Sequence, residues 1–317
     1  MASGLRGGLR LSGAVNRTGR YAPSPTGTLH LGNLRTALLA WLYARAQGAS
    51  FLLRVEDLDA GRVRAHLEGK QLADLHTLGL DWDGEVVRQS ERLDGYAAAL
   101  TRLEADGSIY PCWCTRAEIR EAASAPHGPL PEGHYPGTCR RLTAAQRAER
   151  EASGRPPALR VDAGAARVAF TDRLHGPQDG VVDDFVVRRN DGAFAYNLAV
   201  VVDDGAQGVG EVVRGDDLLD STPRQLWLAA RLGLPEPSFA HVPLVLGGDG
   251  ARLAKRHGAV TLADRLELGE PVDTIRARLA ASVGLCDPAE RPSPAELVAR
   301  FDPAAFAPPP SGPLPGS

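Results

Sequence analysis

Hydrophobic residues follow two different spacings in the first part of this chain. Residues 51–55 form a short apolar run, which predicts a buried strand. The segment before it has helical spacing and predicts a helix ending near Gln47, with apolar residues at Leu31, Leu34, Leu38, Trp41 and Leu42. Strand, turn, helix and strand in this order are typical of the start of a parallel nucleotide-binding sheet.

The same two patterns continue to the end of the chain. Amphipathic periodicity predicts helices over residues 62–79, 91–107, 221–232, one or two within 262–285, and 294–301. Apolar runs predict strands over residues 158–170, 181–188, 192–204, 209–213 and 239–246. We expect residues 192–204 to bring the chain back to the main sheet, and the Pro/Ala/Gly-rich end to be disordered.

Length and composition limit the class of protein. The chain has 317 residues, of which 43% are apolar, so it can bury a substantial core as two domains or as one domain with a large insertion. The formal charge is −3, so overall charge does not indicate nucleic-acid binding, and an RNA contact would need a local basic face. No apolar run is long enough for a membrane span. We expect a cytoplasmic protein that acts without a membrane partner.

Two features of the chain fit that expectation. Residues 1–19 carry three arginines and no acidic residue, but they lack the apolar run of a secretory signal, so we predict a disordered arm. The chain has four cysteines, which is too few for a disulfide framework at this length. Three of them cluster in sequence, which indicates a metal site in a reducing compartment.

The densest chemistry lies in residues 20–33 (RYAPSPTGTLHLGN). Pro23 and Pro25 fix the backbone φ angle and prevent a helix here, while Gly27 allows a tight turn. The turn leads to Thr28 or His30 as the first residue of the predicted helix.

The start of that helix is a candidate phosphate site. His30 and Asn33 are expected at the helix N-terminus, where free N–H groups and the positive end of the helix dipole attract an anion. Gly32 lets a flat ligand approach the backbone.

Polar residues at the ends of predicted strands are further candidates. Glu56 follows the strand over residues 51–55, so its carboxylate is placed to bind a substrate ammonium group, unless it only caps the next helix. Arg214 ends the strand over residues 209–213, where a guanidinium can bind a carboxylate at two points. Tyr196 can line the same crevice.

The clustered cysteines predict a metal site with one open question. Cys112 and Cys114 can hold one ion together with Cys139, and a phenolic oxygen or a water can complete a tetrahedron. Tyr135, His127 and His134 compete for the fourth position. The bare spacing fits buried free cysteines equally well.

Several of these segments resemble one family. Residues 23–33 resemble the HIGH signature of class I aminoacyl-tRNA synthetases in its glutamyl form, and residues 195–204 and 212–225 are similar to the same enzymes. RLAKR, at residues 252–256, matches their KMSKS-type loop. Cys-x-Cys followed by Tyr-x3-Cys is similar to the zinc motif of glutamyl-Q tRNA(Asp) synthetases, which favours Tyr135 as the fourth ligand. The resemblance covers roughly residues 18–290.

This resemblance implies roles for individual residues. The resemblance implies that glutamate is bound by Arg20, Tyr21, Ala22, Pro23, Ser24, Glu56, Tyr196 and Arg214. It implies that ATP, with Mg²⁺, is bound by His30, Gly32, Asn33, Arg252 and Lys255, and that His30 and Lys255 act in catalysis. It also implies that one zinc ion per chain is bound by Cys112, Cys114, Tyr135 and Cys139. Two arginines and a glutamate in one pocket suit a dicarboxylic amino acid rather than glutamine. Ala254 stands where the family has a hydroxyl, which we expect to modulate activity.

The implied fold is an α/β, Rossmann-type class I synthetase domain with an inserted zinc-bearing subdomain and a short helical C-terminal region. The expected divisions are a disordered arm (1–19), a first catalytic half (20–110), the insertion (111–180), a second catalytic half (181–260), a helical region (261–303) and a disordered tail (304–317). A separate anticodon-reading domain is not expected.

The implied reaction is tRNA-independent activation of L-glutamate by ATP. Transfer of glutamate to queuosine in the anticodon stem-loop of tRNA(Asp) would follow, carried out by a monomer. Three alternatives remain open: a truncated glutamyl-tRNA synthetase, a zinc-containing RNA-binding module with a dead active site, and an amino-acid adenylating enzyme with another acceptor.

Overall fold

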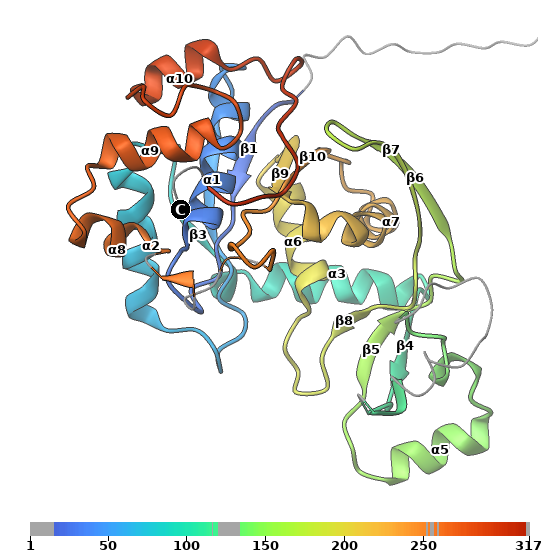
Figure 1. Cartoon of the computed structure of the whole chain (residues 1–317). Helices are drawn as coiled ribbons and strands as arrows, with labels where there is room; N and C mark the ends of the chain where they lie inside the picture. The colour runs from blue at the N-terminus through green and yellow to red at the C-terminus, as the bar shows by residue number, and fades with distance from the viewer. Residues whose placement is uncertain are drawn as a thin grey trace, which may run out of the picture.

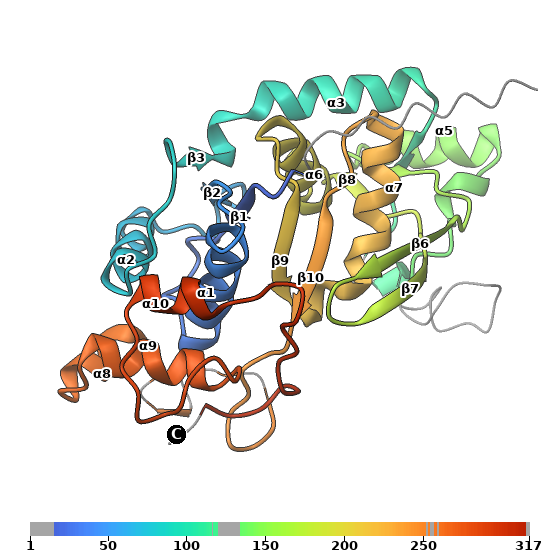
Figure 2. The ribbon, with the colours of Figure 1, turned by 90° about the horizontal axis from the view of Figure 1, so that it is seen from above.

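A computed structural model describes residues 16–115, 117–119, 134–251, 253, 257–258 and 260–314 of the chain. Its centre is a mostly parallel sheet, with one antiparallel edge strand, built from two hydrogen-bonded groups of strands (Figures 1 and 2). The first group has the order β1-β2-β3: β1 (Gly19–Tyr21), β2 (Phe51–Val55) and β3 (Val87–Arg88). The second has the order β7-β6-β10-β9: β6 (Arg167–Asp172), β7 (Gly176–Val181), β9 (Glu211–Gly215) and β10 (Ser238–Val242).

The two groups meet between β1 and β9. The backbone carbonyl of Thr18 accepts hydrogen bonds from the N–H groups of Gly210 and Glu211, so β1 runs beside β9. The strands β1, β2, β9 and β10 therefore bring their carboxyl ends to one edge of the sheet. In an open parallel sheet, this edge is where ligands bind.

Alternate residues of the central strands point to opposite faces of the sheet. Val213 and Ala240 join the main core with α1 (Leu31–Arg45), α9 (Val272–Ala281) and α10 (Pro294–Arg300). Val212 and Phe239 pack instead with Leu226 of α7 (Thr222–Leu232). Both faces of the sheet are covered, so the central strands are largely buried, including charged residues such as Arg54, Glu211 and Arg214.

The remaining described helices lie around these layers, except the helix of residues 144–152, which lies apart from them at the lower right of Figure 1. They are α2 (Ala65–Thr77), α3 (Leu93–Ala105), α5 (Ala144–Ala152), α6 (Tyr196–Ala206) and α8 (Leu262–Glu267), with short 3-10 turns η1 (Gln89–Glu91), η2 (Cys139–Arg141) and η3 (Asp216–Ser221). No described helix is long and apolar enough to span a membrane.

A second, antiparallel sheet projects from the main body (Figure 1). It has the order β4-β5-β8, from β4 (Ile109–Cys112), β5 (Ala158–Val161) and β8 (Val186–Arg188). The β6–β7 hairpin lies in the range of the predicted insertion, yet β6 pairs with β10 of the main sheet through Asp172 and Phe239. The insertion range therefore contributes to both sheets.

Most predicted elements are present, but the strand predicted over residues 192–204 is wrong. Tyr196–Ala206 is the helix α6, with Leu198, Ala199 and Val200 buried. This helix is covered by α3, α7 and β8, so most of its first two turns are apolar and no helical period is visible in the sequence.

A second strand, predicted over residues 181–188, is interrupted. β7 ends at Val181 and β8 begins at Val186, because the intervening Asp183 and Asp184 bind other segments. Asp183 accepts from the backbone N–H of Tyr135, and Asp184 accepts from the hydroxyl of Tyr110.

The expectation of disorder over residues 304–317 also needs correction for residues 304–314. Gly312 forms a parallel bridge with Val245, and the hydroxyl of Ser311 accepts from the N–H of Leu244. Leu314 is buried in the main core. The tail satisfies the backbone groups after β10, which a compositional argument does not detect. Residues 1–15 and 315–317 lie outside the described part of the chain.

Candidate active site and metal cluster

A cleft of about 600 Å³ lies at the carboxyl ends of the central strands. It contains every described residue to which the sequence analysis assigned glutamate or ATP: Arg20, Tyr21, Ala22, Pro23, Ser24, His30, Gly32, Asn33, Glu56, Tyr196 and Arg214. Arg252 and Lys255 lie outside the described residues. The eleven residues in the cleft come from four separate parts of the sequence, which the fold brings to one place.

The loop between β1 and α1 is braced from both sides. Gln71 of α2 donates through its side-chain amide to the carbonyls of Ser24 and Gly27, at 3.1 and 2.7 Å. The N–H of Glu56 donates to the carbonyl of Pro23 at 2.9 Å. The loop is therefore held rigidly beside the end of β2, as the two prolines predict.

His30 is the N-cap of α1. Its Nδ1 accepts from the N–H of Asn33 at 3.2 Å, and the Asn33 side chain accepts from the N–H of His30 at 3.1 Å. This reciprocal capping places the ring proton of a neutral His30 on Nε2. A Cβ on Gly32 would meet the His30 ring at 3.0 Å and Val245 at 3.2 Å, so only glycine fits there without a shift.

A buried ion network supports Arg20. Asp204 of α6 accepts from Nε of Arg20 at 3.3 Å and from Nη1 of Arg54 at 2.7 Å. Arg54, fully buried on β2, also lies 3.5 Å from Glu56 and 3.7 Å from Asp203. Although burial opposes ionisation, the two arginines hold the pKa of Asp204 below its usual value.

The pKa of Glu56 is shifted in the opposite direction from that of Asp204. Burial raises the pKa of its carboxyl, and the attraction of Arg54 and Arg20 offsets this only in part. Its side chain is 11% exposed. The positive charges around this buried carboxylate do not fully offset the cost of its burial. Such a carboxylate is suited to binding a cationic ligand group.

Arg214 is a buried cation whose partners are neutral. Its Nη1 donates to Gln225 at 2.7 Å, its Nη2 to the hydroxyl of Thr222 at 2.8 Å, and its Nε to Nε2 of His241 at 3.0 Å. Burial lowers the pKa of its guanidinium. Among the described residues no ion pair joins Arg214 to a carboxylate, so its charge is available to an anionic ligand in the cleft.

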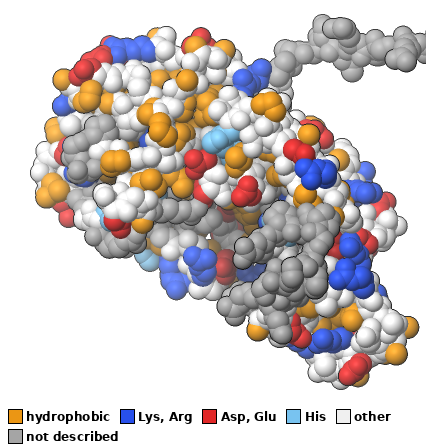
Figure 3. Space-filling view, turned by 45° about the vertical axis from the view of Figure 1, so that its right-hand side comes forward, with side chains coloured by type: hydrophobic (Ala, Val, Ile, Leu, Met, Phe, Trp, Pro, Cys, Tyr) orange, Lys and Arg blue, Asp and Glu red, His pale blue; other side chains and the backbone are white. Residues whose placement is uncertain are grey.

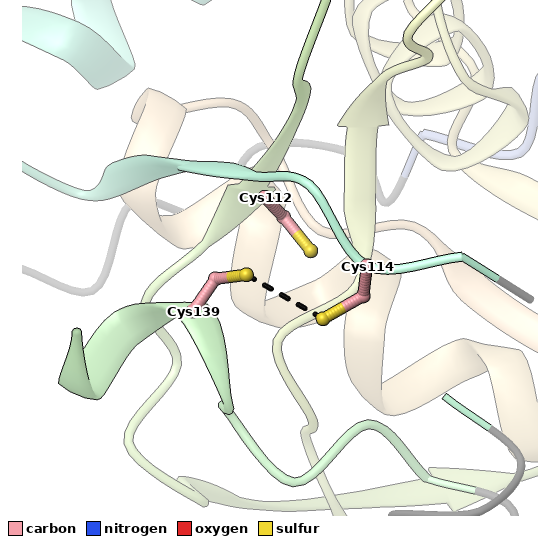
Figure 4. A group of neighbouring side chains, drawn as sticks. All are labelled: Cys112, Cys114 and Cys139. Carbon is pink, nitrogen blue, oxygen red and sulfur yellow. Dashed lines mark hydrogen bonds between the residues drawn. The ribbon is translucent and has the colours of Figure 1, made fainter. Parts of the chain in front are cut away.

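Three cysteines form a compact group in the projecting subdomain (Figure 4). The sulfur atoms of Cys112, Cys114 and Cys139 lie within 4.8 Å of one another, and Cys114 and Cys139 are 3.4 Å apart. The hydroxyl of Tyr135 lies 3.4 Å from Cys112 and 3.5 Å from Cys114. The group is compatible with a bound zinc ion. Of the rival ligands, His134 is not part of this group, and His127 lies outside the described residues.

Comparison with known proteins agrees with this geometry. Residues 17–278 match the family described as tRNA synthetases class I (E and Q), catalytic domain. The Glutamyl-Q tRNA(Asp) synthetase of Nocardia farcinica is 62% identical over 92% of this chain and 91% of its own length. That of Symbiobacterium thermophilum is 54% identical over 90% and 92%. The chain belongs to the class I tRNA synthetase (E and Q) family, in its glutamyl-Q tRNA(Asp) synthetase group.

A solved structure extends the comparison to the fold. A glutamate tRNA ligase from Elizabethkingia meningosepticum, in complex with its amino acid, is similar with a TM-score of 0.80 and 26% identity. The alignment covers 94% of this chain and 67% of that one. The chain is therefore a ligase of the synthetase class with the expected α/β fold, and its family uses ATP, an amino acid and tRNA.

A second cleft of this synthetase, of about 750 Å³, adjoins the first. The two share Ser24, Glu56 and Tyr196 as lining residues. The second cleft continues toward the cysteine group, with Cys112 and Cys114 in its wall, and adds Arg155, Arg160, Arg189, Asn190 and Phe194. In Figure 3 several basic side chains lie over the lower-right part of the molecule, which carries α5 in Figure 1.

Sequence reasoning missed the residues that hold the synthetase's arginines in place. Arg54, Asp204 and His241 are all buried, and each acts through a partner far away in the sequence. Buried charges inside apolar runs were the one available signal, at Arg54 in FLLRV and at Asp203 and Asp204 after VVV.

Proposed function

We propose that this enzyme activates L-glutamate with ATP in the absence of tRNA and transfers the glutamyl group to queuosine in the anticodon loop of tRNA(Asp). The observation that carries the proposal is the convergence of Arg20, Arg214 and Glu56 on one cleft. Relatives 62% and 54% identical to the chain are named for this activity, which supports the choice of acceptor.

The charges of the cleft suit a dicarboxylic amino acid. Arg214 has only neutral partners among the described residues, so its uncompensated charge attracts the side-chain carboxylate of glutamate, and one N–H of its Nη1 is left to donate to that carboxylate. Glu56 binds the ammonium group. A glutamine amide cannot replace the carboxylate, because Arg214 would then be buried without a counter-charge.

The other wall of the cleft suits ATP. His30 donates through Nε2–H to a phosphate oxygen, and the positive end of the α1 dipole adds to the attraction. Gly32 lines the same cleft and lets the His30 ring and Val245 pack close to the backbone there. Mg²⁺ bound to the triphosphate would neutralise part of its charge, and Arg252 and Lys255 supply further positive charge in the sequence.

The activation step needs positioning more than a protein nucleophile. The α-carboxylate oxygen of glutamate attacks the α-phosphorus of ATP, forming glutamyl-adenylate as the bond to pyrophosphate breaks. His30 stabilises the charge that develops on the α-phosphate oxygens. A nucleophilic oxygen of the RNA acceptor then takes the glutamyl group, and AMP leaves.

The cysteine group fits zinc by its distances. In a tetrahedral site with thiolate and oxygen ligands, sulfur and oxygen lie about 3.5 Å apart, close to the two distances measured for Tyr135. We therefore assign Cys112, Cys114, Cys139 and Tyr135 as ligands. The ion would anchor the projecting subdomain, which has only a small core of its own.

The second cleft suits the RNA acceptor. Arg155 and Arg189 offer positive charge for phosphates, and Phe194 offers an aromatic surface for a splayed-out base. Because this cleft shares Tyr196 and Glu56 with the first, a base seated there reaches the adenylate directly.

The test supplies radiolabelled glutamate, ATP and one of three RNAs: tRNA(Asp) with queuosine, the same tRNA without it, or tRNA(Glu). We expect label on the first RNA alone, and retention of that label when the 3′ CCA end is removed. Label on tRNA(Glu) that is lost with its CCA end would instead establish 3′ charging, the activity suggested by the similarity to the glutamate tRNA ligase.

A further inference from the structure

Three adjacent strands carry a chain of buried polar side chains that ends at Arg214. Arg214 of β9 is paired in register with His241 of β10. On the other side of β10, Asp172 is the last residue of β6. His241 is fully buried, and Asp172 and Arg214 are 1% and 5% exposed. Such a row of polar groups inside a sheet is costly unless each donor meets an acceptor.

The hydrogen bonds of this row determine the tautomer of His241. Arg214 can only donate, so Nε2 of His241, 3.0 Å from Nε of Arg214, must be an unprotonated acceptor. The ring proton then lies on Nδ1, which donates to Asp172 at 2.7 Å. The backbone N–H groups of Leu174, His175 and His241 also donate to Asp172 and keep it ionised.

The ring itself is fixed by its neighbours. Phe239 stacks on His241 with centroids 5.8 Å apart and an interplanar angle of 9°. The hydroxyl of Thr222 lies 3.2 Å from Nε2 and accepts from Arg214. The lone pair of Nε2 therefore points at the Arg214 guanidinium, and Asp172 prevents the alternative tautomer.

We propose that His241, held by Asp172 with its proton on Nδ1, is a positioning residue for amino-acid selection. It accepts from Nε of Arg214, while Gln225, Thr222 and the carbonyl of Leu218 accept from the other two nitrogens, so the guanidinium is held in one orientation with one N–H of Nη1 left for a carboxylate. Its own neutrality leaves the charge of Arg214 uncompensated. A carboxylate at this position would neutralise Arg214 and weaken discrimination against glutamine. The inference rests on the proposed role of Arg214 in glutamate binding.

Two variants of His241 separate its two hydrogen bonds. In His241→Asn, the shorter amide lies near the position of Nδ1, so it can still donate to Asp172 but cannot reach Arg214. In His241→Gln, the amide oxygen lies near the position of Nε2, so it can still accept from Arg214 but leaves Asp172. Both variants lose the ring and its stacking on Phe239, which makes each the control for the other.

The kinetic test is glutamate-dependent ATP–pyrophosphate exchange with purified full-length protein and no RNA. We expect His241→Asn to raise KM for glutamate about tenfold, with kcat and KM for ATP changed less than about twofold. We expect His241→Gln to keep KM for glutamate within about threefold of the parent. Equal rises in the two variants, or rises that follow their loss of thermal stability, would overturn the proposal.

A spectroscopic test does not depend on activity. In the ¹⁵N-labelled parent protein, long-range ¹H–¹⁵N correlation spectra report which ring nitrogen of His241 carries the proton, and the signal is assigned by its loss in His241→Gln. We expect a proton on Nδ1 alone at pH 7. A proton on Nε2 would overturn the inference even if glutamate activation occurs. If the parent activates no glutamate, the proposed function fails, while the tautomer result still stands or falls separately.

Discussion

Asp204 and Glu56 are two carboxylates beside Arg54 whose pKa values shift in opposite directions. Asp204 lies 2.7 Å from Arg54 and also binds Arg20, and these arginines lower its pKa against the effect of burial. Glu56 lies 3.5 Å from Arg54, and burial raises its pKa despite the arginines. We infer that Asp204 stabilises the fold, whereas burial makes the charged form of Glu56 costly, a cost that a cationic ligand group would relieve.

Replacement of Asp204 by asparagine tests the first half of this inference. Because it removes the charge between Arg20 and Arg54, we expect the unfolding free energy at pH 7 to fall by roughly 3 kcal/mol. A carboxylate with a lowered folded-state pKa stabilises the protein above its unfolded pKa of about 3.9, and this contribution is lost as pH falls through the folded pKa. Urea unfolding at pH 7 and at about pH 2.5, below the unfolded pKa, should show the difference in unfolding free energy between variant and parent narrowing. A difference that stays the same or widens at the lower pH would contradict the assignment.

Replacement of Glu56 by glutamine tests the second half of this inference. Here the expected change in unfolding free energy has the opposite sign. A carboxylate with a raised folded-state pKa loses stability as pH rises through its unfolded pKa, so removing the charge should leave the unfolding free energy at pH 7 unchanged or higher. The same variant should raise KM for glutamate at least about tenfold in pyrophosphate exchange, because the ammonium group loses its partner. A variant that is both less stable and fully active would refute the role of Glu56.

At the scale of elements, sequence patterns succeeded where the periodicity was local. The helix after His30 and the strand before Glu56 were predicted because amphipathic spacing and caps act over a few residues. Residues 192–204 were assigned to a strand because α6, which is covered on several sides, carries apolar residues at strand-like density. Asp172 and His241 escaped notice since 69 residues separate them, and only the pairing of β6 with β10 brings them together.

The metal site is an element-scale prediction. Cys139→Ser should reduce bound zinc from about one ion per chain to almost none, measured by elemental analysis of purified protein, because one thiolate ligand of a tetrahedral site is lost. The projecting subdomain should become sensitive to protease, as its core contains few other residues. The matched control is Cys286→Ser, which removes a cysteine outside the cluster that donates to the carbonyl of Ala277. Full zinc content in Cys139→Ser would contradict the site.

At the scale of the whole molecule, the proposed reaction assigns a different step to each of the two clefts. The first holds the charged groups for activation, and the second runs from the shared residues Ser24, Glu56 and Tyr196 toward the cysteine group. The β4-β5-β8 sheet carries the second cleft's far wall, including Arg160 and Val186. Activation without RNA and transfer to RNA should therefore respond to different substitutions.

The substitution Arg189→Ala tests whether activation and transfer depend on different clefts. Arg189 is exposed, lines the second cleft only and is joined to Asp191 of the same loop. We expect glutamate-dependent pyrophosphate exchange to stay within about twofold of the parent, while transfer to queuosine-containing tRNA(Asp) weakens about fivefold to tenfold. The loss should be in KM for the tRNA, and the salt dependence of binding should decrease by about one phosphate contact. Arg167→Ala is the matched control. Like Arg189, Arg167 forms an exposed ion pair, in its case with Asp179, but it lines neither cleft. Equal effects of the two substitutions on transfer would show that overall charge, rather than the second cleft, attracts the RNA. Loss of pyrophosphate exchange in Arg189→Ala would show that the two clefts do not act separately.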